Sequence, residues 1–148
     1  MHLIAHNIRS LHNVGAIFRS ADAFGIKKLW LTGYTAAPPR PEIAKVALGS
    51  DQRVAWEKRE DLDDLIKELR IQGFSIAALE TGKGSIPINN FHHPAMETVL
   101  ILGNEVEGLE PRILEQVDNI LAIPMLGKKQ SLNVSVAAGI AMFSLTQK

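Results

Sequence analysis

The chain has 148 residues, in which 16 Lys and Arg balance 16 Asp and Glu, and it contains no cysteine. This length suits one domain with a core of its own, and the charged fraction of 22% is close to the globular average of about 25%, so disordered, collagen-like and disulfide-rich classes are excluded. The absence of cysteine also excludes zinc ribbons and thiol nucleophiles.

Apolar runs of strand length alternate with helical patterns from one end of the chain to the other. The predicted strands cover residues 3–5, 28–32, 54–56, 74–79, 98–102 and 120–123. This alternation is typical of an α/β fold with a mostly parallel sheet and helices on both of its faces. The chain shows no linker, repeat or low-complexity tract, so we expect one domain over residues 1–148, with no N- or C-terminal extension.

Four helical patterns lie between and after these strands. The first follows the strand at residues 3–5, and Asn13 is its predicted cap. Residues 61–72 carry apolar side chains at the spacing of an amphipathic surface helix, and Pro111 opens a short helix at its first turn. The final helix, from about residue 132 to 145, is apolar nearly all round, which predicts burial on more than one side.

No segment of the chain predicts export or insertion into a membrane. Residues 1–6 are too few and too polar for a secretory signal. The longest apolar stretch, residues 134–145, falls well short of the ~18 residues that a membrane span needs. We therefore expect a cytoplasmic protein without a membrane partner.

Three of the predicted strands run into unusual loops. These loops, at residues 79–85, 103–108 and 124–131, all carry glycine, which lets a backbone approach a ligand closely. Because ligands bind beyond the carboxyl ends of parallel strands, we expect the loops to converge on one pocket lined mainly by backbone groups. The chain has no GxGxxG after its first strand, and neither of its Gly–Lys pairs belongs to a phosphate loop, so ordinary NAD or ATP binding is not expected.

Four polar residues allow both a structural and a functional interpretation. Arg19 lies opposite the apolar stripe of the first predicted helix, where it is either a solvated arginine paired with Asp22 or, given the small residues that flank it, a group that packs beside a ligand. Ser131 and Asn133 are suited to cap the last helix, and Glu105 is suited to accept bonds from backbone N–H groups. Their spacing alone does not bring them together.

The histidines do not predict a metal site. His92 and His93 precede a proline in a predicted loop, and His2 and His6 have no acidic companion at metal-ligand spacing. We therefore expect no bound metal.

The zero net charge hides an uneven distribution along the chain. Residues 1–60 carry nine Lys and Arg against five Asp and Glu, residues 61–120 carry four against eleven, and residues 121–148 carry three against none. A basic pole built from the two ends would permit an anionic partner. On charge alone, a mixed solvated surface is the simpler interpretation.

Three runs of residues form a recognisable set. The first, residues 13–25, reads Asn-Val-Gly-Ala-Ile-Phe-Arg-Ser-Ala-Asp-Ala-Phe-Gly; the second is residues 100–109, and the third combines residues 123–127 with 131–137. The set resembles the three motifs of the SpoU-type (TrmH-like) RNA ribose 2′-O-methyltransferases of the SPOUT superfamily. All three occur in the family's order and frame nearly the whole chain, which makes the resemblance specific where one motif would be weak.

The resemblance implies a fold that the periodicity does not predict. The family folds as an α/β knot, in which the C-terminal segment threads through a loop to form a deep trefoil, and it works as a homodimer with the last helix near the interface. The three loops would then form the knot and hold S-adenosylmethionine in a bent shape. By similarity, the residues expected to bind this cofactor are Leu79, Glu80, Thr81, Gly103, Asn104, Gly108, Ile123, Met125, Ser131, Leu132 and Ala137.

The resemblance also implies a reaction, the transfer of a methyl group from the sulfonium to a ribose 2′-hydroxyl of a structured RNA, tRNA rather than rRNA. A guanidinium is effectively never deprotonated in proteins, so we assign Arg19 an electrostatic role in stabilising the developing alkoxide and gripping the adjacent phosphate, itself a candidate proton acceptor. Asn13, Glu105, Ser131 and Asn133 would orient the arginine, the ribose and the loops.

RNA would have to bind to the surface of the dimer, because we expect no separate RNA-binding domain. Such contacts give a salt-dependent grip on phosphates, and specificity comes from shape or from splayed bases. The identity of the RNA and the need for an auxiliary protein stay open at this point. The candidate RNA-binding residues are Arg9, His12, Arg40, Lys45, Arg53, Lys128 and Lys129.

Two alternatives come from other functional classes. One is an RNA-binding module that keeps the knot but does no chemistry, and the presence of Arg19, Glu105, Ser131 and Asn133 argues against it. The other is a flavodoxin-like binding or signalling domain, which would lack the run at residues 131–136. Saturable binding of S-adenosylmethionine excludes the flavodoxin-like domain, and turnover excludes the non-catalytic module.

Overall fold

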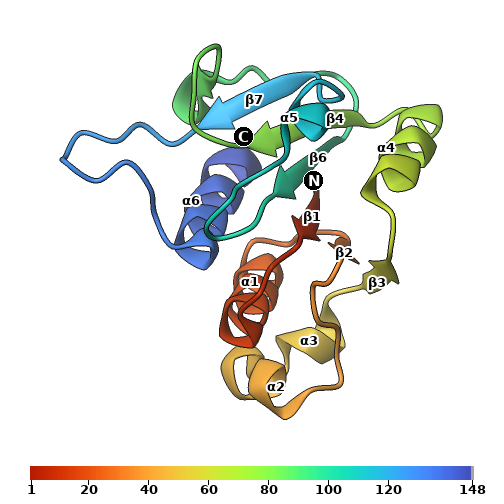
Figure 1. The fold of residues 1–148 in the computed structure, drawn as a ribbon. Coiled ribbons are helices and arrows are strands. Elements are labelled where there is room, and N and C mark those ends of the chain that lie inside the picture. The colour runs from red at the N-terminus through yellow and green to blue at the C-terminus, as the bar shows by residue number, and fades with distance from the viewer. Residues whose placement is uncertain (148) are drawn as a thin grey trace.

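The computed structural model describes residues 1–147 and shows one parallel sheet with helices on both faces (Figure 1). Within these residues the sheet has seven strands in the order β3-β2-β1-β6-β4-β7-β5, and every neighbouring pair is parallel. The strands are β1 His2–His6, β2 Leu29–Thr32, β3 Trp56–Arg59, β4 Ser75–Leu79, β5 Ile86–Pro87, β6 Thr98–Leu102 and β7 Asn119–Ala122. The helices are α1 Leu11–Ala23, α2 Pro41–Ala47, α3 Ser50–Arg53, α4 Leu62–Ile71, α5 Pro111–Leu114 and α6 Val134–Thr146, with a 3-10 turn, η1, at Ile88–Asn90.

The predicted α/β class and its parallel sheet are confirmed, with local differences. The strand predicted at residues 54–56 begins two residues and ends three residues too early, since β3 covers Trp56–Arg59, where it pairs with β2 at the edge of the sheet. The helices α2 and α3 and the two-residue strand β5 were not predicted.

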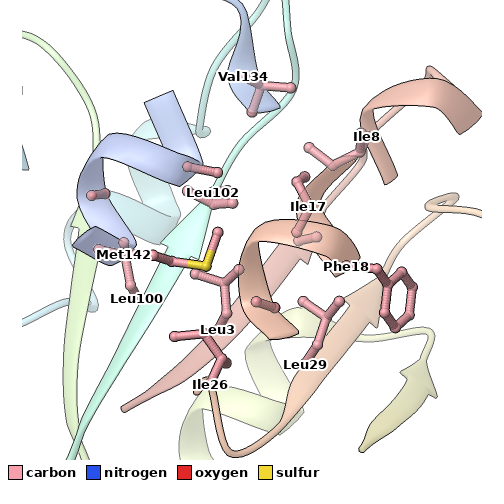
Figure 2. Packing of buried hydrophobic residues seen from close by; sticks show 14 of the residues in the cluster. Leu3, Ile8, Ile17, Phe18, Ile26, Leu29, Leu100, Leu102, Val134 and Met142 are labelled. Atoms are coloured by element: carbon pink, nitrogen blue, oxygen red, sulfur yellow. The ribbon is translucent and has the colours of Figure 1, made fainter. Parts of the chain in front are cut away.

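The two faces of the sheet bury separate apolar clusters, because side chains alternate along each strand. On one face, α1, α2 and α6 cover strand residues such as Leu3 and Leu100, and Figure 2 shows Ile17 of α1 and Met142 of α6 converging on them. On the opposite face, α4 and α5 cover residues such as Ile4. The alternation thus gives the helices of each face a hydrophobic surface to pack against.

The helix α1 is capped by Ser10 rather than by Asn13. The Ser10 hydroxyl accepts a bond from the Asn13 N–H, and Asn13 lies inside the first turn, which frees its side chain for other contacts. Gly15 allows α1 to pack closely on α2, because a Cβ there would lie 2.6 Å from the Ile43 carbonyl oxygen. The Ser10 cap thus sets where α1 begins, and Gly15 sets how closely it packs on α2.

The helix α6 is buried on one side only within this chain. Its inner face, which includes Ala138 and Met142, packs on the sheet. An outer row of apolar residues, here called the α6 stripe, is exposed by 38 to 54% and consists of Val136, Ile140 and Phe143. The prediction of burial on more than one side is thus not met within a single copy of the chain. None of the helices in residues 1–147 is long and apolar enough to cross a membrane.

The direction of the strand order changes between β1 and β6. After β1 the chain adds β2 and then β3 on one side of that strand. The later strands β4, β6 and β7 lie on the opposite side of β1. The carboxyl ends of parallel strands at such a switch point open into a crevice, which is bordered by the loops after β1 and β6.

Candidate active site

The loops after β4, β6 and β7 line one cavity of about 450 Å³. This volume lies in the range of about 300–1,000 Å³ typical of small-molecule sites. The convergence predicted from the sequence is therefore confirmed as geometry, while binding by these residues stays a prediction. The cavity is lined by all eleven residues expected to hold the cofactor, Leu79, Glu80, Thr81, Gly103, Asn104, Gly108, Ile123, Met125, Ser131, Leu132 and Ala137.

Two glycines let the loop at residues 103–108 fold tightly against its neighbours. A Cβ at Gly103 would lie 2.7 Å from the Gly108 backbone, and one at Gly108 would collide with the Glu80 carboxylate. Gly108 also adopts a φ of +68°, which other residues reach only with strain. Glu80 uses the space, since its Oε2 accepts a bond from the Leu109 N–H at 3.0 Å and ties the loop after β4 to the loop after β6.

Glu105 joins the loop after β6 to the start of α1. Its carboxylate accepts bonds of 3.1 Å from the backbone N–H groups of Arg9 and Ser10 and from the Asn13 side-chain amide. Burial alone would raise the pKa of Glu105, but these hydrogen bonds outweigh it and lower the pKa below its ordinary value of 4.5. The prediction that Glu105 accepts backbone N–H bonds is confirmed, and the carboxylate is held ionised beside the cavity that it lines.

Asn133 links the same cluster to α6. Its side-chain oxygen accepts the Ser135 N–H at 2.9 Å and so caps α6, as predicted, while its amide donates to the Asn13 Oδ1 at 3.2 Å. Ser131 lies exposed in the loop before the helix and lines the cavity without capping α6. Asn13, Glu105 and Asn133, which lie far apart in the sequence, thus form one hydrogen-bonded chain.

Arg19 lies apart from this cluster. It is exposed on α1, does not line the cavity, and makes no hydrogen bond or ion pair within the described part of the chain. The alternative in which Arg19 pairs with Asp22 is not what the structure shows, because Asp22 pairs with Arg53 at 2.6 Å and with the Ser50 hydroxyl at 2.8 Å. These bonds, chiefly that from Arg53, lower the pKa of Asp22.

The candidate RNA-binding residues fall in three exposed places. Arg9 and His12 lie at the start of α1, and Lys128 and Lys129 lie in the long segment between β7 and α6, drawn at the left of Figure 1. The third group lies on α2 and α3, where Arg53 is occupied by Asp22 and Arg40 lies 3.9 Å from Glu42; its members are Arg40, Lys45 and Arg53.

The histidines take structural positions. His6 is buried and lies 2.9 Å from the Thr32 hydroxyl, and burial lowers its pKa. Burial likewise lowers the pKa of His2, although its contact with Glu97 opposes the shift. Within residues 1–147 no three His, Cys, Asp or Glu side chains gather as a metal site would require.

Tyr34 is a polar contact of the site that was not predicted. Its hydroxyl lies 2.7 Å from the Asn104 side-chain amide, which also donates to the Asn7 carbonyl oxygen at 3.0 Å. An aromatic residue directly after Gly33, the glycine that follows β2, was the only signal in the sequence. Glu107 and Gln130 also line the cavity, and both belong to loops that were predicted to form it.

The arrangement suits a small ligand with an apolar ring and several polar groups. Apolar residues such as Leu79, Ile123 and Leu132 form part of the wall, and glycine-containing loops form much of the rest.

Comparisons with known proteins give a consistent picture. Residues 1–143 match the model of a family described as the SpoU rRNA methylase family. Over 142 residues the chain is 37% identical to the tRNA (guanosine(18)-2′-O)-methyltransferase of Aquifex aeolicus (strain VF5), an alignment that covers 95% of this chain and 66% of that protein.

Solved structures agree in fold over nearly the whole chain. An AdoMet-bound rRNA methyltransferase from Sinorhizobium meliloti superposes with a TM-score of 0.90 at 28% identity, covering 97% of this chain and 54% of that one. A structure whose description concerns the 2-OH methylation of C/U34 on tRNA superposes with a TM-score of 0.84 at 25% identity. The superposition covers 99% of this chain and 97% of that one. The chain spans about half to two thirds of the length of the curated relatives it matches.

Proposed function

Because this chain belongs to the SpoU rRNA methylase family, we propose that it is an S-adenosylmethionine-dependent methyltransferase acting on a ribose 2′-hydroxyl of a structured RNA. The observation that carries the proposal is the cavity at the carboxyl ends of β4, β6 and β7, which is lined by all eleven residues expected to bind the cofactor. The Aquifex relative is named for tRNA, which supports tRNA over rRNA as the substrate.

The cavity fits the proposed cofactor in its chemistry. Leu79, Ile123 and Leu132 offer an apolar wall for the adenine ring, and the polar backbone of the loops offers partners for the ribose and the amino-acid end. When bound there, S-adenosylmethionine supplies a methyl group on a sulfonium, which is a good leaving group. The protein is therefore required mainly to position the accepting hydroxyl and to stabilise the charge that develops on it.

Arg19 provides that stabilisation in the proposed mechanism. Its guanidinium stays protonated, so it acts on the 2′-oxygen and the neighbouring phosphate electrostatically and not as a base. The hydrogen-bonded chain of Asn13, Glu105 and Asn133 fixes the start of α1 against the loop after β6 and against α6. These three residues thereby hold α1, which carries Arg19, in a constant position, and Ser131 orients substrate at the cavity wall.

A homodimer is part of the proposal. The α6 stripe is an apolar helix face that a monomer would leave in water, and α1 packs beside α6. Since Arg19 does not line the cavity of its own chain, pairing of two copies through α6 offers a way to bring it to the cavity of the other copy. The dimer would then be needed for chemistry as well as for burial.

The family's trefoil knot is proposed on similar grounds. The loop at residues 103–108, the segment after β7 and the start of α6 all meet at the cavity, as threading of the C-terminal segment requires. We also keep as predictions that the protein works in the cytoplasm, and that Arg9, His12, Lys128 and Lys129 contribute to a salt-dependent grip on RNA. An auxiliary protein would be revealed by activity that appears only in cell extract.

The test uses the purified protein, methyl-labelled S-adenosylmethionine and undermodified bulk RNA, followed by digestion to nucleosides. Label in a 2′-O-methylated nucleoside is the expected result, and separating the RNA by size before digestion identifies tRNA or rRNA as the substrate. Label in a base methyl group would overturn the ribose assignment. Saturable binding of the cofactor without any transfer would favour the non-catalytic RNA-binding module.

A further inference from the structure

An open hollow of about 590 Å³ lies directly beside the cofactor cavity. It is lined by Arg9, Tyr34, Asn104, Val106 and Glu107, and the last three of these also line the cavity. The loop after β6 therefore forms a common wall, so a group in the hollow lies next to a ligand in the cavity.

Tyr34 is held rigidly at this hollow although its side chain is largely in water. Its backbone N–H donates to Asn7 Oδ1 at 3.1 Å, and its hydroxyl lies 2.7 Å from the Asn104 amide. Gly33 supports the turn with a φ of +61°, and a Cβ there would collide with the Asn7 side chain. Tyr34 is nevertheless 57% exposed, so the fold holds an aromatic residue in place without burying it.

The side chains of Arg9, Val106 and Glu107 in the hollow are free to meet a ligand, whereas Asn104 is occupied by its bonds to Tyr34 and Asn7. Within residues 1–147 the side chains of Arg9 and Glu107 form no ion pair, although both line the hollow, and Val106 is 82% exposed. These groups suit a nucleotide: an exposed aromatic ring can stack on its base, an unpaired cation can bind its phosphate, and an unpaired carboxylate can accept bonds from the N–H groups of the base.

We propose that this hollow is the subsite for a nucleotide of the substrate RNA, with Tyr34 as the surface on which its base stacks. Arg9 contacts the phosphate, and Glu107 accepts from N–H groups at the edge of the base. The inference rests on the proposed function, because it places the accepting ribose beside the cavity wall that the two sites share.

The first test observes Tyr34 directly, because the chain contains a single tyrosine. Protein labelled in its tyrosine ring is saturated with S-adenosylhomocysteine and titrated with each of the four nucleoside 5′-monophosphates, while the ring signals are followed by NMR. We expect a saturable upfield shift, with GMP, which offers two adjacent N–H donors, binding more tightly than UMP. Arg9→Ala should weaken the binding of GMP several-fold and leave the binding of guanosine, which has no phosphate, unchanged. Ring signals that no nucleotide moves would overturn the proposal.

The second test measures methyl transfer to bulk tRNA. Tyr34→Ala should lower kcat/KM for RNA about tenfold or more, since stacking of one base on an aromatic ring is typically lost at this cost, and should leave the affinity for S-adenosylhomocysteine unchanged. Tyr34→Phe should lose less, because the ring remains. Met96→Ala, which alters a side chain of similar exposure before β6, is the control and should behave as wild type.

The two proposals fail in different ways. A wild-type protein that binds no S-adenosylmethionine and transfers no methyl group contradicts the proposed function, whatever the titration shows. An active wild type with an equally active Tyr34→Ala variant contradicts only the nucleotide subsite. A parallel loss of affinity for S-adenosylhomocysteine would assign Tyr34 a structural role through Asn104 and would also contradict the subsite.

Discussion

The helices α4 and α6 lie on opposite faces of the sheet and differ in how much of their apolar surface one chain buries. In α4 the inner residues Leu62, Leu65, Ile66 and Leu69 are buried, while the outer face carries charged residues such as Lys67 and Glu68. In α6 the inner face is equally buried, but the outer face is the apolar α6 stripe. α4 is thus complete within one chain, whereas α6 has a surface suited to a second copy and its first turn borders the cavity.

The largest effect is expected on the α6 side of the sheet, where α1 carries Arg19. Arg19→Ala should reduce methyl transfer by about 10²–10³-fold, the usual cost of removing one group that stabilises a developing oxyanion, with the affinity for S-adenosylmethionine unchanged. Arg70→Ala, which removes an exposed arginine from α4, is the matched control and should leave the rate unchanged. A normal rate in Arg19→Lys would contradict the proposed role, since lysine lacks the planar fork.

A mixing experiment tests whether Arg19 acts across two copies. Ala137→Phe places a bulky side chain in the cavity that Ala137 lines and should abolish cofactor binding. When the two variants are co-expressed, each mixed dimer contains the intact cavity of the Arg19→Ala copy and the intact Arg19 of the Ala137→Phe copy. If Arg19 acts across the interface, mixed dimers should recover activity that neither variant has alone. Absence of recovery in mixed dimers would assign Arg19 to its own chain.

The next effect concerns stability on the α4 side. Leu65 is fully buried, so Leu65→Ala should lower the free energy of unfolding by about 3 kcal/mol through lost burial and a residual cavity. Urea unfolding followed by tryptophan fluorescence measures this change. The folded variant should keep the methyl-transfer rate and oligomeric state of wild type, because α4 lies on the face away from α1 and α6. A change in oligomeric state would contradict the contrast between the two helices.

A pair of isoleucine variants compares the outer faces of the two helices. Ile140→Asp in the α6 stripe should weaken dimerisation by at least about 2 kcal/mol, since one apolar side chain of this size is lost from the interface and a charge replaces it. Ile71→Asp at the end of α4 changes a residue that is 87% exposed. It should leave the oligomeric state unchanged and alter the free energy of unfolding by no more than about 0.5 kcal/mol. Sedimentation of both variants at several concentrations gives the comparison, and a dimer that persists in Ile140→Asp would exclude the α6 interface.

The contrast between α4 and α6 also explains which parts of the fold could be predicted. The amphipathic pattern of residues 61–72 and the buried strands in the centre of the sheet carry strong periodic signals, and they were predicted within a few residues. The edge strand β3 reads Trp-Glu-Lys-Arg and is only half-buried, so it lacks the apolar run that a strand prediction requires. The helix α2 begins at the third of three prolines within residues 38–41, and both α2 and α3 are short, which made this segment resemble a loop.

The residues that line the cavity were predictable one by one, but the hydrogen bonds that join its loops were not. The glycines of the loops and the capping role of Asn133 follow from local chemistry, and the family motifs supply the residues expected to bind the cofactor. The contact between Asn13 and Asn133 spans 120 positions in the sequence and depends on the packing of α1 against α6. Tyr34 was missed for the same reason, since its partner Asn104 lies on another strand end.

The smallest predicted effect tests the hydrogen-bonded chain between α1 and α6. Glu105 has a pKa below 4.5 in the folded protein, so its ionised form stabilises the fold above that pH, and the contribution is lost as the pH falls through the lowered pKa. Glu105→Gln should therefore cost about 1 kcal/mol at pH 7, and the difference from wild type should shrink below pH 4.5.

The control for Glu105 lies at the start of α4, where Asp61 accepts the Asp64 N–H at 3.0 Å. Asp61→Asn keeps a capping oxygen and should cost only about a few tenths of a kcal/mol. Thermal unfolding of both variants between pH 3 and pH 8 measures the two costs. A cost for Glu105→Gln that does not depend on pH would mean that shape, and not the charge of the carboxylate, holds α1 beside α6.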